Sequence, residues 1–169
     1  MAFARMRLLV ATLWAGSLWT VALLAQMLFA GFERATAGAV ASAMFRVESW
    51  LSLGCAALLA VLWARECGAD ACRGRALRLV LAMAACALVL QFGIAPLMAA
   101  LREAAGAGAL TTSMRTRFGV LHGVAALFYL SECVLAGVLV LDVHATLRAA
   151  LPAIGPACAA GKAGDAGPV

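Results

Sequence analysis

The chain has 169 residues, of which 66% are apolar and 12% are charged. A soluble domain averages roughly 45–50% apolar and about 25% charged residues, so this composition excludes a water-exposed globular domain. The same hydrophobicity excludes a disordered chain. The net charge of +5 comes from arginines scattered between apolar runs, without interleaved aromatics. This pattern indicates membrane topology and lipid-headgroup contact rather than nucleic-acid binding.

Four apolar runs are long enough to cross a bilayer, which needs about 20 residues of helix. We therefore predict an all-α, four-span transmembrane helix bundle within residues 1–150. The predicted spans are about residues 8–30, 47–64, 76–98 and 118–141. The intervening segments are expected to be an Ala-rich helix at the interface or extending the spans (31–46), a polar loop (65–75) and a loop with some helix (99–117). Residues 151–169, rich in Ala, Gly and Pro, are expected to be a disordered tail.

Charge distribution predicts the orientation of these spans. With four spans, both termini share a side, and that side carries eight basic residues against five on the other. Because positive charge favours the cytoplasmic side, we expect a bacterial inner-membrane protein with both termini in the cytoplasm. The alternative is that the first run is a cleaved signal sequence, which would leave three spans. Its length and the lack of a cleavage site before Gln26 disfavour this alternative.

Polar side chains inside a membrane are candidate functional residues, because burying them there is costly. Counting 1.5 Å per residue from the predicted span ends places one group just below the outer surface. Its members are Gln26, Arg46, Glu48 and His122. We predict that Glu48 and His122 point into the bundle within hydrogen-bonding reach of each other. Such a pair could bind a cation or relay a proton, or simply hold the spans together.

A second polar layer is predicted deeper in the bundle. It consists of Cys55, Cys86, Glu132 and Cys133. Thiolates at one depth could bind a soft metal such as Cu(I), but cysteine also packs well as a small apolar residue, and no CxxC or Met-rich motif accompanies these. The pattern identifies no particular metal. A carboxyl as deep as that of Glu132 is expected to be neutral or paired.

Helical spacing predicts which side chains face the bundle interior. Residues at i, i+4 and i+7 share one helix face. In the second span that face carries Glu48, Ser52 and Cys55. In the fourth span the corresponding face carries His122, Ala126, Tyr129 and Cys133.

No catalytic signature is found in the sequence, which lacks a HExxH, a GxSxG, a phosphate-binding loop and a Gly-rich dinucleotide turn. We therefore expect neither enzymatic activity nor a cofactor. A bis-histidine haem site would need two histidines at membrane depth, and only His122 qualifies.

Four short motifs occur in a recognisable order: Trp14-Ala15-Gly16-Ser17 in the first span, Met44-Phe45-Arg46 at the second, Pro96 near the end of the third, and Phe118-Gly119-Val120-Leu121-His122-Gly123 opening the fourth. Over about residues 8–141 the chain resembles a bacterial domain-of-unknown-function family grouped with transmembrane protein 205. The resemblance implies a four-span fold and a membrane location. It also implies a proposed link to resistance against metal-containing drugs, and a fainter similarity to D-type copper-resistance membrane proteins.

Three functions from different classes follow as hypotheses. The first is a small integral membrane protein that supports transport of, or resistance to, a solute or metal. The second is a structural or assembly subunit of a larger membrane complex. The third, with least support, is a membrane haem protein or enzyme. The expected surroundings are the lipid bilayer together with a membrane-protein partner or further copies of the chain, and no nucleic acid.

Overall fold

The computed structural model describes residues 2–65, 71–105 and 111–150, and almost all of them are helical. The helices are α1 (Ala2–Gly31), α2 (Arg34–Ala64), α3 (Ala71–Leu88), the π-helical segment η1 (Val89–Ile94), α4 (Ala95–Ala105) and α5 (Thr112–Ala150). Four stretches are long and apolar enough to span a bilayer: 3–31, 34–64, 74–104 and 112–149. The predicted all-α, four-span bundle is confirmed, and the chain is a multi-pass membrane protein.

The spans are longer than the apolar runs predict. Residues 34–46 continue directly into the second span, and the third span runs through Pro96 to Ala105 rather than ending in a loop. At η1 the backbone N–H of Ala95 donates to the carbonyl of Leu90, five residues earlier. Pro96 has no N–H, and its ring would press on the preceding turn, so the wider π turn allows the helix to continue. The predicted tail, residues 151–169, lies outside the described residues.

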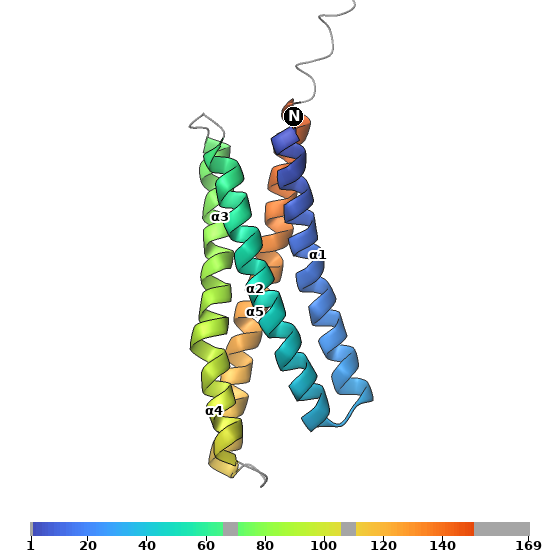
Figure 1. Ribbon diagram of the computed structural model, residues 1–169, viewed down its shortest axis with the longest axis vertical. Helices are drawn as coiled ribbons and strands as arrows, with labels where there is room; N and C mark the ends of the chain where they lie inside the picture. Colours follow the sequence, from blue (N-terminus) through green and yellow to red (C-terminus); the bar gives the residue numbers. More distant parts are fainter. Residues whose placement is uncertain (1, 66–70, 106–110, 151–169) are drawn as a thin grey trace, which may run out of the picture.

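The four spans form a bundle in which each packs against two neighbours (Figure 1). α1 contacts α2 and α5, and α3 contacts the same two helices from the opposite side. α2 and α5 therefore lie across the bundle from each other. We call the end where α1 begins and α5 ends the terminal end, and the end where α1 passes into α2 the far end. Figure 1 places the start of α1 beside the end of α5, so the helical termini share one side of the bundle.

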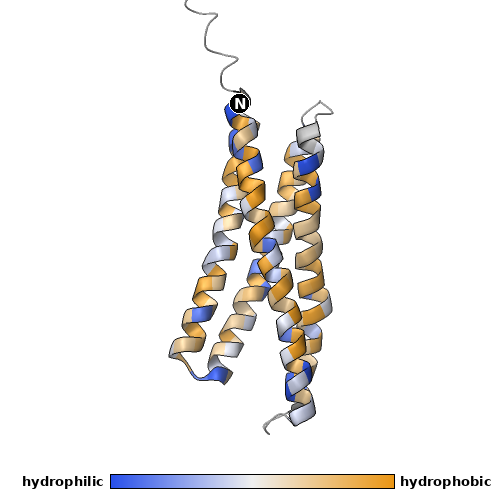
Figure 2. Ribbon diagram, turned by 180° about the vertical axis from the view of Figure 1, so that it is seen from behind, coloured by the Kyte–Doolittle hydropathy of each residue, from blue (hydrophilic) through white to orange (hydrophobic). Residues whose placement is uncertain are grey.

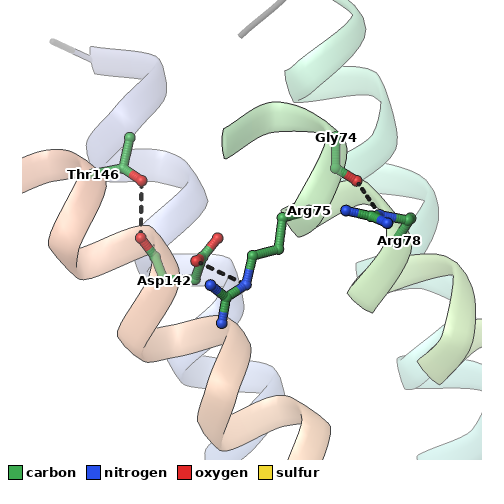
Figure 3. A network of polar contacts seen from close by, with 5 residues as sticks. All are labelled: Gly74, Arg75, Arg78, Asp142 and Thr146. Carbon is green, nitrogen blue, oxygen red and sulfur yellow. Dashed lines mark hydrogen bonds and ion pairs between the residues drawn. The ribbon is translucent and has the colours of Figure 1, made fainter. Parts of the chain in front are cut away.

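The terminal half of the bundle contains a close-packed core. Its largest side chains are fully buried and come from all four spans: Trp14, Leu18, Leu59, Met83 and Leu139. Two contacts hold the helix ends together there. The Arg7 guanidinium lies 5.7 Å from the Trp63 ring centroid, and Arg75 Nε lies 3.5 Å from Asp142 Oδ1, which joins α3 to α5 (Figure 3).

The far half is different, because its helices diverge in two pairs. Both ribbon views show α1 and the start of α2 leaning away from α4 and the start of α5 (Figures 1 and 2). Within the described residues, α4 contacts only α5 and η1. Hydrophobic residues cover the outside along most of the helix length (Figure 2). Large exposed side chains such as Leu23, Met27, Leu97 and Leu127 are what a lipid-facing surface requires.

Candidate functional site: a buried carboxyl cluster

Two glutamates lie in the interior of the bundle at mid-depth. Glu48 is 14 residues from the start of α2, about 21 Å along the helix, and Glu132 is 20 residues from the start of α5, about 30 Å. Their exposed fractions are only 4% and 2%. Ser52 lies one helical turn after Glu48 and is also buried, as the i, i+4 spacing predicts. α2 and α5 thus aim a carboxyl each into the bundle from opposite corners.

Two residues of α1 complete the group. Trp14 Nε1–H donates to Ser52 Oγ at 2.8 Å. The Ser17 hydroxyl oxygen lies 2.8 Å from the Trp14 carbonyl oxygen and 3.0 Å from Glu48 Oε1. Glu132 lies close enough to Glu48 for electrostatic interaction between the two carboxyl groups. We call this set the carboxyl cluster; its members are Trp14, Ser17, Glu48, Ser52 and Glu132.

The polar groups of the cluster are incompletely paired. Glu132 Oε1 is the buried side-chain oxygen, among the described residues, that has no hydrogen-bond partner. In the same part of the chain, no arginine, lysine or histidine forms an ion pair with Glu48 or Glu132. Buried polar atoms almost always have a partner, and buried charges are usually paired. An orphaned carboxyl oxygen inside a membrane bundle is therefore a candidate for binding or exchanging an ion.

The predicted thiol layer surrounds this cluster. Cys55 and Cys133 are buried and Cys86 is half-buried, and all three are free thiols. Cys55 and Cys133 are close enough to Glu48 for electrostatic interaction, and Cys86 and Cys133 to Glu132. However, the described residues contain no group of three or more His, Cys, Asp and Glu side chains placed to hold a metal ion.

The two sides of the cluster are closed to different extents. Toward the terminal end lies the close-packed core, several side chains deep. Toward the far end lies an aromatic pair, Phe45 and Tyr129, whose ring centroids are 5.0 Å apart in an edge-to-face arrangement. The Tyr129 hydroxyl donates to the Leu18 carbonyl oxygen at 2.7 Å, which holds the ring across the bundle. The cluster thus lies between the close-packed core on one side and the Phe45–Tyr129 pair on the other.

The predicted outer group of Gln26, Arg46, Glu48 and His122 is not assembled. Gln26, Arg46 and His122 are exposed, and His122 stacks on Phe118 with ring centroids 6.4 Å apart. The predicted pairing of His122 with Glu48 is wrong, because Glu48 is buried and bonded to Ser17 whereas His122 is exposed. The early start of α2 places Glu48 about 13 Å deeper than Gln26, which is five residues from the end of α1.

A second error concerns the face of α5. His122 and Cys133 are three turns apart and share a face, yet Cys133 is buried and His122 is exposed. Neighbouring helices cover this face of α5 around Cys133. In the far half, near His122, the same helices have diverged from α5. Trp14 and Tyr129 form hydrogen bonds, and Phe45 forms a ring contact, that no sequence pattern predicted. One signal was present in the sequence. Trp14 lies three residues before Ser17 in the first span, and its indole N–H needs a hydrogen-bond partner when it is buried.

Comparison with protein families places the chain. The model of a domain of unknown function (DUF4149) matches residues 8–107, more than half of the chain. The chain belongs to this family. The matched DUF4149 region contains α1 to α4 and includes Trp14, Ser17, Glu48 and Ser52, whereas Glu132 on α5 lies beyond it. No curated protein and no solved structure matches the chain significantly.

Proposed function

We propose that this DUF4149 protein supports transport of, or resistance to, a solute or metal, and that the carboxyl cluster is its ion-binding centre. One observation carries the proposal: the Glu132 carboxyl is 2% exposed inside a membrane bundle, and its Oε1 atom has no partner. Ionisable groups within transmembrane segments are expensive, and they mark ion pathways and proton relays. The proposed activity is non-enzymatic.

Ion flux in proteoliposomes tests this proposal. The purified full chain is reconstituted into vesicles that contain a pH-sensitive or metal-sensitive dye, and flux is followed under an imposed gradient. We expect the wild-type chain to carry ions, and Glu132→Gln to reduce the flux to that of empty vesicles. Glu103→Gln is the matched control, because Glu103 is an exposed carboxyl on α4. Equal flux from Glu132→Gln and wild-type vesicles, or none from wild-type vesicles, would contradict the proposal.

The resemblance to the transmembrane protein 205 group favours a role in resistance to metals. We infer that the membrane is the bacterial inner membrane and that the terminal end faces the cytoplasm, since that end carries eight of the thirteen basic residues. A reporter active only in the cytoplasm, fused after Leu151, should be active. A periplasmic signal from the same fusion would contradict this orientation.

A structural or assembly subunit is the second candidate, and the divergence of the two helix pairs at the far end favours it. Helices in lipid associate through close packing, and among the described residues α4 contacts one span, α5, besides η1. This candidate predicts that one membrane-protein partner co-purifies with the chain at fixed stoichiometry in mild detergent. Recovery of the chain alone, as a functional monomer, would contradict it.

A further inference from the structure

The oxygen atoms of the carboxyl cluster make more close contacts than its hydroxyl groups can bridge. Ser17 and Ser52 each carry a single hydroxyl hydrogen. The Ser17 hydroxyl oxygen has two close oxygen neighbours, the Trp14 carbonyl at 2.8 Å and Glu48 Oε1 at 3.0 Å, and each contact needs a hydrogen. One hydrogen is therefore missing at Ser17, and a second is missing at Glu132, whose buried Oε1 has no hydrogen-bond partner. The two carboxyl groups are the sites that can carry these hydrogens.

The first missing hydrogen belongs on Glu48. A serine within a helix typically donates its hydrogen to a carbonyl three or four residues earlier, as Ser17 does to Trp14 at 2.8 Å. The remaining contact, 3.0 Å between Ser17 Oγ and Glu48 Oε1, then has no hydrogen unless Glu48 supplies it. A protonated Glu48 donates to Ser17 Oγ, and both contacts become hydrogen bonds.

The second missing hydrogen belongs on Glu132. The Glu132 carboxyl is 2% exposed, and no basic side chain of the described residues forms an ion pair with it. An ionised Glu132 would therefore be a buried, unpaired charge, whereas a protonated Glu132 is neutral. Its Oε1, which has no partner, is then the carbonyl oxygen of a neutral acid. Burying a neutral acid costs less free energy than burying an unpaired carboxylate.

The charges around the cluster favour the same assignment. The titratable groups that face the two carboxyls are Tyr129 and the thiols of Cys55, Cys86 and Cys133, none of which offers a positive charge. Two ionised glutamates here would repel each other through a medium of low dielectric constant. Two neutral acids satisfy every contact without a counter-ion.

We propose that the carboxyl cluster is a two-proton site, with one proton on Glu48 and one on Glu132, and that the ion bound there is the proton. This inference deepens the proposed function and rests on it for the role of the site. A metal cation at the same oxygens would have to displace these protons first.

Infrared spectroscopy of the full chain in lipid at neutral pH tests the two-proton site directly. Protonated carboxylic acids absorb in a carbonyl-stretch region separate from that of carboxylates. We expect two such bands, each shifting in heavy water, with one lost in Glu48→Gln and the other lost in Glu132→Gln. Glu103→Gln should leave both bands intact, because Glu103 is exposed. Carboxylate bands for Glu48 and Glu132 in the wild-type chain would overturn the proposal.

Two further measurements keep the test decisive. If a glutamine variant does not fold, Ser17→Ala should shift the carbonyl band of Glu48, because Ser17 Oγ lies 3.0 Å from Glu48 Oε1; an unshifted band would overturn the proposal. Addition of Zn²⁺ or Na⁺ should leave the wild-type bands unchanged, and their loss would identify a metal cation as the preferred ion.

Intact bands without ion flux would reject only the proposed function, whereas flux without these bands would reject only the two-proton site.

Discussion

The terminal and far halves of the bundle contain the same four apolar spans but differ in packing. In the terminal half, four helices surround a core of fully buried side chains that includes Trp14, Leu59 and Met83. In the far half, no residue of α4 with a described side chain is buried, and none of α5 from 112 to 131 is. The buried glutamates lie where the packed half ends. Apolar composition alone therefore does not create an interior in a membrane protein; contact with neighbouring helices does.

The largest expected effect comes from the core of the packed half. Trp14→Ala removes a fully buried ring and the N–H that donates to Ser52, so it should lower the free energy of unfolding by about 3–5 kcal/mol. Trp19→Ala, at a side chain that is 50% exposed on the same helix, should cost much less. Equilibrium unfolding in lipid discs measures both variants. Equal losses would show that the two surfaces of α1 do not differ in packing.

A smaller effect is expected at the boundary between the halves. Tyr129→Phe keeps the edge-to-face contact with Phe45 but removes the hydroxyl that donates to the Leu18 carbonyl. A hydrogen bond between transmembrane helices contributes about 0.6–2 kcal/mol, so the variant should lose stability within that range. It should also speed the exchange of the carboxyl protons in heavy water. Unchanged exchange would mean that the Tyr129–Leu18 hydrogen bond does not limit access to the carboxyl protons.

The smallest effect is expected in the far half. His122→Ala removes an exposed imidazole that stacks on Phe118, and it should change the free energy of unfolding by no more than about 0.5 kcal/mol. It should also leave ion flux and both carboxyl bands intact. Loss of flux in a folded His122→Ala protein would instead restore His122 as a site residue and extend the functional region into the far half.

Much of the site could be predicted residue by residue, but its grouping could not. Spacing along the second span correctly placed Glu48, Ser52 and Cys55 on one buried face. The deep location of Glu132 beside Cys133 was also predicted correctly. The level of Glu48 was wrong, since the count began at residue 47 whereas α2 begins at Arg34. Alanine, glycine and serine in 34–46 weaken the apolar signal without ending the helix.

The sequence by itself determined the fold class and the four spans. In a bilayer every backbone N–H and C=O must be satisfied within the segment, so long apolar runs of this length can only be helices. The sequence also determined which side chains share a face, because the helical period fixes rotation about each helix's own axis. Only the tertiary structure decided that Trp14, Ser17, Glu48, Ser52 and Glu132 meet, and that His122 does not join them. The levels of neighbouring helices, and the point where they diverge, depend on packing between side chains far apart in the chain, which no local period encodes.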